Sequence, residues 1–221
     1  MKYFTIKSTS EKKIIGNEFP QIQTMAGSVN RADDNSVYNV FPDAFPEFVP
    51  NLNYFVLHRN SKVTDVLSAS MISGGFIVNT RVREILEKYS LPEHRFYPAT
   101  VECNNKLDDN YAWFFFVSDV LDFIDYGRTK FYLCDMLDNR IRDCQVDSAN
   151  NLRAMKDILP DDRNINSDHV YLMETFHDRF DIFKVTFGDY RTYVSERLKD
   201  AFDQAGITGL KMLPTESIEV D

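Results

Sequence analysis

The chain has 221 residues, of which 43% are hydrophobic and 27% charged, so it can bury a sizeable core and is not intrinsically disordered. It carries 25 Lys and Arg against 34 Asp and Glu, which gives a formal net charge of −9, and its isoelectric point is about 5.0. Proteins that bind nucleic acid through the phosphate backbone are usually basic, so nucleic acid is not expected as a direct partner.

The first 60 residues are predicted to be rich in strands and loops. They form either an N-terminal region packed on residues 61–221 or part of one continuous domain. Residues 1–8 are expected to be a short strand, without the apolar stretch that a signal peptide contains. The prolines of residues 41–50 disfavour helix, because each removes a donor and restricts the residue before it. This segment is expected to be extended, with its aromatic side chains on the body; the alternative is a docking ledge for a partner.

Three amphipathic helices are predicted from apolar residues that recur with helical spacing. The first begins with Asn79 or Thr80 as its N-cap. The second lies near residues 149–159. The third covers residues 195–205, with Gly206 at the position of a left-handed C-terminal cap.

Strands are predicted where β-branched and aromatic residues gather between turn residues. They are expected over residues 53–59, 95–102, 111–117, 140–146, 169–174 and 179–188, and residues 76–78 form a buried strand or lead-in segment. Helices are few and the strands mostly antiparallel by their spacing, which favours the α+β class.

Two parts of the chain resemble each other at an offset of 116 residues. Residues 78–86 align with 194–202, and residues 95–98 align with 211–214. Each copy has an apolar start, a polar cap, a helix and then a strand that ends in proline. Because identities are few, a shared helix-to-strand pattern without common ancestry is favoured, although an internal repeat is an alternative. A true repeat would place the two helices in pseudo-symmetric positions.

The three cysteines, Cys103, Cys134 and Cys144, have no spacing typical of a metal or redox pair. They are expected to be reduced, as in a cytosolic protein, and a disulfide between Cys134 and Cys144 is the less favoured alternative. The longest apolar run spans residues 111–117, well below the roughly 20 residues that cross a bilayer. The chain is therefore expected in the cytoplasm, with no membrane as a partner.

No pattern typical of an enzyme is found in the sequence. The four histidines lack the i, i+4 spacing of a helical zinc site, and neither a nucleophile motif nor a phosphate-binding glycine loop occurs. A metal site formed by Asp119, Asp122 and Asp125 is a distant alternative, since residues three apart converge only on a helix. The sequence therefore predicts no catalytic residue, no metal site and no cofactor.

Most of the net negative charge lies in residues 108–182, which hold 16 acidic residues against eight basic ones. All but one of these acids are aspartates, which favour turns and loop edges. Ordinary solvation of loops and an acidic surface that steers a basic partner explain this concentration about equally well. Under the second interpretation, the candidate partner-binding residues are Asp108, Asp109, Asp119, Asp122, Asp161 and Asp162.

Eight short segments carry a resemblance to known proteins through their order and spacing. They are residues 64–67 (TDVL), 75–78 (GFIV), 81–86 (RVREIL), 95–99 (RFYPA), 111–113 (YAW), 122–126 (DFIDY), 194–199 (VSERLK) and 207–210 (ITGL). Together, over about residues 63–214, they resemble a family of bacterial immunity proteins from polymorphic toxin systems, formerly a domain of unknown function. One departure is that residues 127–129 (GRT) follow the Asp-Tyr pair, where the family commonly has a Ser.

The resemblance implies a small cytosolic protein that binds and neutralises a cognate toxin encoded beside it, with no catalytic activity. It assigns no site residue to this chain, because the residues that the family shares look structural. A basic toxin, such as a nuclease-like domain, would suit the acidic surface. The alternative is a cytosolic enzyme of unrecognised type, which predicts a deep cleft that gathers several carboxylates.

Overall fold

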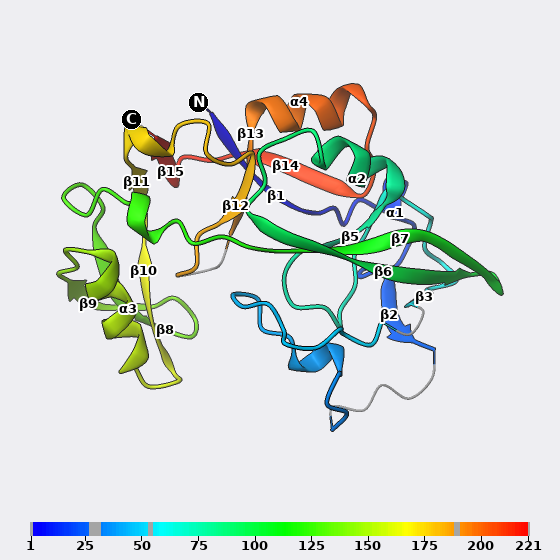
Figure 1. Ribbon diagram of the computed structural model, residues 1–221, viewed down its shortest axis with the longest axis horizontal. Helices are drawn as coiled ribbons and strands as arrows, with labels where there is room; N and C mark the ends of the chain where they lie inside the picture. Colours follow the sequence, from blue (N-terminus) through cyan, green and yellow to red (C-terminus); the bar gives the residue numbers. More distant parts are fainter. Residues whose placement is uncertain (1, 27–31, 53–54, 188–190, 221) are drawn as a thin grey trace.

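The computed structural model describes residues 2–26, 32–52, 55–187 and 191–220 (Figure 1). Within these ranges the chain forms four α-helices and fifteen strands. All but two of the strand pairings are antiparallel, so the α+β class predicted from the sequence is confirmed. The ends of two predicted strands, residues 53–54 and residue 188, lie outside the described residues.

Two β-sheets form the body of the molecule (Figure 1). The first sheet has the strand order β2-β3-β6-β7-β5-β4, and the second has the order β12-β13-β1-β14. The strands of the first sheet are β2 (Ile22–Met25), β3 (Phe55–Leu57), β4 (Val66–Leu67), β5 (Phe76–Asn79), β6 (Glu93–Cys103) and β7 (Lys106–Val117). The strands of the second sheet are β1 (Tyr3–Ser8), β12 (Ile182–Lys184), β13 (Thr192–Ser195) and β14 (Leu210–Pro214).

The three predicted helices are present as α2 (Thr80–Leu86), α3 (Ala149–Asp157) and α4 (Glu196–Gln204). Asn79 caps α2 by accepting a hydrogen bond from the backbone N–H of Val82. Gly206 has a φ of 63° after α4, as the sequence predicted for a left-handed cap. The remaining helix, α1 (Lys12–Ile15), was not predicted, because four residues are too few to show helical periodicity.

A separate three-stranded sheet lies at the left in Figure 1, opposite the long hairpin of β6 and β7. It consists of β8 (Phe131–Asp135), β9 (Arg140–Cys144) and β10 (Arg163–Ser167). With α3 these strands make up residues 131–167, which we call the small lobe. Of its strands only β9 was predicted, because the short β8 and the polar β10 lack clear alternation of apolar residues. Nearby, β11 (Val170–Leu172) pairs in parallel with β15 (Ile218–Val220).

The pairing registers of the two main sheets agree at the 116-residue offset seen in the sequence. Val66 of β4 lies opposite Val78 of β5, and Ile182 of β12 lies opposite Val194 of β13. The helices α2 and α4 follow β5 and β13, contact each other and line the same core. This is the pseudo-symmetric placement that a true repeat requires, so the structure favours an internal repeat over a coincidence of local patterns.

The central strand of each sheet comes from the other repeat. In chain order the first repeat runs from β1 to β6 and the second from β7 to β14. Strand β7 nevertheless lies between β5 and β6, and β1 lies between β13 and β14. The registers match again, because Tyr111 of β7 pairs with Asn79 as Tyr3 of β1 pairs with Ser195. The two repeats have therefore exchanged their first strands, much as subunits do in a domain-swapped dimer.

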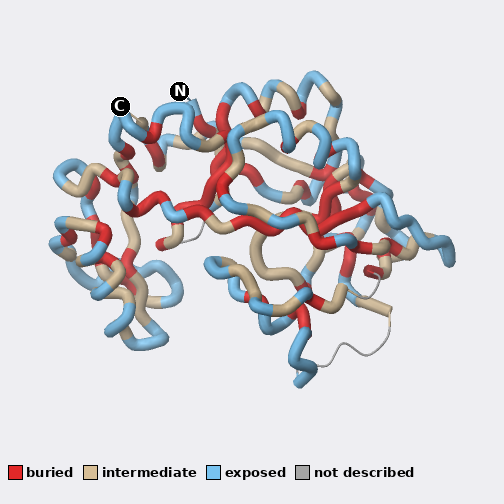
Figure 2. The backbone as a smooth tube through the Cα atoms, in the orientation of Figure 1, coloured by how far each residue is buried: buried red, intermediate tan, exposed pale blue. Residues whose placement is uncertain are grey.

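Three hydrophobic clusters stabilise this arrangement. The central cluster lies between the two sheets and both repeat helices and includes Ile6, Phe114 and Phe202. A second cluster covers the outer face of the first sheet and includes Phe55 and Trp113. The third covers part of the outer face of the second sheet with residues of the small lobe and its flanks. Figure 2 shows the buried backbone running through the centre, with exposed backbone in the loops of the small lobe and at the tip of the β6–β7 hairpin.

Residues 41–50, the proline-spaced segment, contain no helix, as predicted. Phe45 and Phe48 pack against the cluster on the first sheet, which agrees with the expected packing of its aromatics on the body. Phe41 and Val49, in contrast, are exposed. The segment thus covers the sheet with one side and presents apolar atoms to solvent with the other.

Two aspartates that are 116 residues apart join the repeats to each other. Asp65, just before β4, accepts hydrogen bonds from the backbone N–H and the hydroxyl of Thr208, at 2.8 and 2.7 Å. Asp181, just before β12, accepts one from the backbone N–H of Ser90, at 2.8 Å. Thr208 follows α4 and Ser90 follows α2, so each repeat binds the turn that follows the helix of the other repeat.

Candidate partner-binding surface

The six aspartates that the sequence selected are Asp108, Asp109, Asp119, Asp122, Asp161 and Asp162. All of them are exposed, but they lie in three separate places. The first pair lies in the β6–β7 hairpin, at the opposite end of the molecule from the small lobe (Figure 1). The second pair follows β7, and the third lies in the loop between α3 and β10. The structure therefore does not bring the six into one patch.

Ion pairs within the chain already engage several of these aspartates. Arg153 of α3 donates to Asp119 at 2.6 Å and to Asp122 at 3.3 Å. Arg163 donates to Asp162 at 2.7 Å. Exposed ion pairs of this kind add little stability, yet they offset the local negative charge. Charge alone consequently does not define a binding surface on this molecule.

The aspartates of the alternative metal site do not converge either. Asp119 and Asp122 contact Arg153, while Asp125 accepts a hydrogen bond from the backbone N–H of Gly127 at 2.9 Å. Throughout the described ranges, no group of three or more His, Cys, Asp or Glu side chains is placed to hold a metal ion. The three cysteines are free thiols, and burial raises the pKa of Cys134 to about 11.

One end of the small lobe exposes four large apolar side chains, which we call the apolar tip: Met136, Leu137, Ile141 and Ile158. Met136 and Leu137, 72% and 83% exposed, lie in the turn between β8 and β9, and Ile141 follows in β9. Ile158, 82% exposed, follows α3. The loop after it reaches the same end of the sheet, because Arg163 at the start of β10 pairs with Asp135 at the end of β8.

The turn that carries the apolar tip has a defined local structure. The carboxylate of Asp135 accepts hydrogen bonds from the backbone N–H groups of Leu137 and Asn139, both at 2.9 Å. The side-chain amide of Asn139 also donates to it, and these hydrogen bonds lower the pKa of Asp135, so this carboxylate stays ionised. Asp138 has a φ of 62°, which an aspartate tolerates in a turn. Hydrogen bonds within the turn thus hold Met136 and Leu137 outward.

Apolar side chains that cluster on a surface within a polar rim are typical of protein interfaces. Exposed aspartates flank the residues of the apolar tip along the chain, and we call them its rim: Asp138, Asp157, Asp161 and Asp162. Two of these belong to the aspartates that the sequence selected, whereas the apolar residues themselves were missed. The hydropathy of residues 131–167 could have indicated the exposed turn at residues 136–139. That the loop after α3 reaches the same end of the sheet follows only from the pairing of β8 with β10.

The alternative of an enzyme predicts a deep cleft lined by several carboxylates. Two large cavities in the structure can be examined for such a lining. One, of about 780 Å³, adjoins the small lobe and has two carboxylates, Asp143 and Asp147, in its lining. Asp143 is in an ion pair with Arg140 at 2.7 Å. The other cavity, of about 670 Å³, has lysine and arginine but no acidic side chain among the described residues that line it. Among the described residues, neither cavity gathers several free acids in its lining.

Comparison with protein-family models gives the class of this chain. The model of the Imm11 immunity protein family matches residues 3–217. The chain belongs to this family. The Imm11 match begins at Tyr3, the first residue of β1, and so extends well before the resemblance over residues 63–214. The matched range thus includes β1, which lies between β13 and β14 in the second sheet.

A search of curated proteins finds no match to this Imm11 chain. Among the residues that the structure describes, no helix has the length and apolar character needed to cross a bilayer.

Proposed function

We propose that this Imm11 protein binds and neutralises a cognate bacterial toxin by direct contact, without catalysing a reaction. We also propose that the apolar tip is the centre of the binding surface. The observation that carries the proposal is the cluster of exposed apolar side chains within acidic loops of the small lobe. Membership of an immunity protein family supports toxin neutralisation, and the free thiols support a cytoplasmic location.

The chemistry of this surface fits a basic toxin. Full burial of a Met, Leu or Ile side chain contributes about 1.5–3 kcal/mol, so the four residues of the apolar tip can serve as anchors. The rim aspartates would attract a positively charged partner and set its orientation, which affects the association rate more than the affinity. Asp108 and Asp109, at the far end of the molecule, lie outside the proposed surface.

The test is growth of a susceptible host that expresses the neighbouring gene, with and without this protein. We expect growth arrest that co-expression relieves. The double variant Met136→Asp/Leu137→Asp should lose this protection, because charged groups replace the apolar anchors. Both side chains are exposed, so the variant should keep the unfolding transition of the wild type.

Val49→Asp is the matched control, because Val49 is 74% exposed but lies in the proline-spaced segment. It should protect fully. Loss of protection in Val49→Asp, with protection intact in the double variant, would move the binding surface to the proline-spaced segment. Toxicity that the wild-type protein fails to relieve would contradict the proposed function itself.

A further inference from the structure

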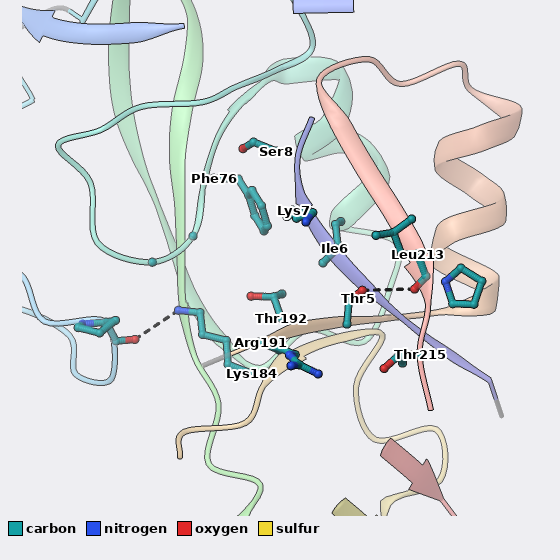
Figure 3. Close-up of a pocket in the computed structure, with 14 residues that line it drawn as sticks. Thr5, Ile6, Lys7, Ser8, Phe76, Lys184, Arg191, Thr192, Leu213 and Thr215 are labelled. Atoms are coloured by element: carbon teal, nitrogen blue, oxygen red, sulfur yellow. Dashed lines mark hydrogen bonds between the residues drawn. The ribbon is translucent and has the colours of Figure 1, made fainter. Parts of the chain in front are cut away.

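A cationic groove opens beside the second sheet, with a volume of about 670 Å³ (Figure 3). Its lining comes from β1, the start of β5, the β12–β13 segment and β14. Lys7, Lys184 and Arg191 surround the cavity, and the described lining contains no acidic side chain. On a chain with a net charge of −9, this local excess of positive charge indicates a site for a negatively charged ligand.

Lys184 is the buried cation of the groove, with an exposed fraction of 4%. Its ammonium donates to the carbonyl oxygens of Phe116 and Pro42, at 2.9 and 3.3 Å, and lies 4.3 Å from the ring centroid of Phe116. These groups are uncharged. Burial lowers the pKa of Lys184 to about 8, while the charge of Asp43 opposes this shift. A carboxylate in the groove would add a negative charge close to a lysine whose hydrogen-bond partners are uncharged carbonyl oxygens.

Gly74 leaves the room that this lysine needs. A Cβ at position 74 would lie 2.9 Å from Nζ of Lys184, and the φ of 75° also favours glycine there. Because Gly74 has no side chain, the ammonium of Lys184 can lie close to the backbone there, at the edge of the groove.

The internal repeat explains why the groove is open. On the first sheet, Trp113 and Phe115 of β7 are covered, and the ring of Phe45 from the proline-spaced segment packs 5.5 Å from that of Phe115. The equivalent residues of β1 are Thr5 and Lys7, by the matching registers of the two sheets. These two residues instead line the groove. The first sheet therefore shows what kind of segment fits on such a face. On the second sheet, the part of this face around Thr5 and Lys7 lines an open cavity.

We propose that this groove binds an extended, acidic segment of the toxin, placed against the second sheet as the proline-spaced segment is placed against the first. The cations would pair with carboxylates of that segment, and the hydroxyls of Thr5, Thr192 and Thr215 could bind its polar groups. The inference rests on the proposed function for the identity of the partner, and it adds a second contact to that of the apolar tip.

The first arm of the test uses the whole chain and a fluorescein-labelled peptide of six glutamates as the probe. We expect fluorescence anisotropy to show binding that Lys7→Glu/Arg191→Glu weakens by about tenfold or more. The control variant Lys12→Glu/Lys13→Glu changes the net charge equally at exposed lysines of α1, outside the groove lining. It should change the affinity much less. Equal weakening in both variants would overturn the groove as the site.

The second arm measures affinity for the product of the neighbouring gene with the same variants. We expect the groove variant, but not the control, to bind this toxin several-fold more weakly. The variant Lys7→Gln/Arg191→Gln removes the two charges without reversing them. If its unfolding transition equals that of the wild type, weaker binding by this variant cannot come from a folding defect. Toxin affinity unchanged by the groove variants would overturn the inference and leave the proposed function intact. A wild-type chain that binds the hexaglutamate but not the toxin would overturn the proposed function and the assignment of the segment to the toxin.

Discussion

Lys184 and its counterpart in the first repeat show how one position can carry different chemistry. The residue 116 positions earlier is Ser68, which is also buried but neutral. Ser68 accepts a hydrogen bond from the backbone N–H of Gln21 at 2.9 Å, so its polar group is satisfied within the fold. Lys184 instead places an ammonium among carbonyl oxygens and aromatic rings at the wall of a groove. Burying a charged group is costly, and such groups often belong to functional sites.

We predict that Lys184→Met changes the pH dependence of stability. The pKa of Lys184 is about 8 in the folded chain, against 10.5 for an ordinary lysine. Below pH 8 both the folded and the unfolded state hold the proton, and burial of the ammonium costs about 3 kcal/mol. As the pH rises through 8 towards 10.5, the folded state loses its proton first, so the free energy of unfolding of the wild type rises relative to that of the variant. Urea unfolding of both proteins across this range measures the difference. A difference that stays constant with pH would contradict the prediction.

At the scale of elements, the same side chains cap the repeat helices and hold the repeats together. Ser195 accepts from the backbone N–H of Leu198 as the N-cap of α4, and its hydroxyl donates to Asp181 at 2.5 Å. In the first repeat, Asn79 caps α2 and its amide donates to Asp65 at 3.0 Å. Burial opposes ionisation of Asp65, but the hydrogen bonds from Thr208 and from Asn79 outweigh it and lower the pKa of Asp65. Both aspartates therefore connect a helix start to the turn after the other helix.

We predict that Asp181 contributes more to stability than Asp65. Asp181 is fully buried and forms an ion pair with Arg197, so Asp181→Ala should lower the free energy of unfolding by about 3–5 kcal/mol. The side chain of Asp65 is partly exposed, as is its partner Arg81, so Asp65→Ala should cost about 1–2 kcal/mol. Urea unfolding at neutral pH measures both losses.

Asp203→Ala is the control for these two variants. Asp203 forms an exposed i, i+4 pair with Lys199 on α4, so its loss should lower the free energy of unfolding much less than the loss of Asp181. If Asp181→Ala and Asp65→Ala lower the free energy of unfolding equally, burial does not determine how much each aspartate contributes to stability.

At the scale of the whole molecule, charge and apolar surface are distributed unevenly. The cationic groove lies beside the second sheet, and the apolar tip with its acidic rim lies at the end of the small lobe. Exposed aspartates also occur on the β6–β7 hairpin at the opposite end (Figure 1). A partner that binds the small lobe would therefore be steered by aspartates at that end, since charges more than about 10 Å away are largely screened at ordinary ionic strength.

We predict different effects from two neutral pairs of substitutions. Asp161→Asn/Asp162→Asn should slow association with the toxin and weaken its dependence on salt, because the rim of the apolar tip loses two charges. Asp108→Asn/Asp109→Asn removes the same charge from the β6–β7 hairpin and should leave the association rate nearly unchanged. Stopped-flow or surface-binding kinetics at several salt concentrations measure both rates. A larger effect from the hairpin pair would place the binding surface at that end.

Elements with strong local signals could be predicted from the amino-acid sequence. Asn79 marks the start of α2 and Gly206 the end of α4, because both are typical capping residues. The helical spacing of apolar residues over 80–86 and 196–204 indicates the helices themselves. The 116-residue offset was also visible, because two copies of one local pattern can be compared without a structure. The α+β class and the immunity family followed from these patterns and from the order of short segments.

Contacts between residues far apart in the chain could not be predicted without the fold. The exchange of β1 and β7, the joining of Asp65 to Thr208, and the arrival of the loop after α3 at the same end of the small lobe as the β8–β9 turn all depend on pairing between distant segments. The cationic groove likewise needs Lys7 and Lys184 to come together from the two ends of the sequence. Helical and strand periods are set within a few residues, whereas pairing register is set by the packing of the whole core, so the sequence predicts the former and the fold decides the latter.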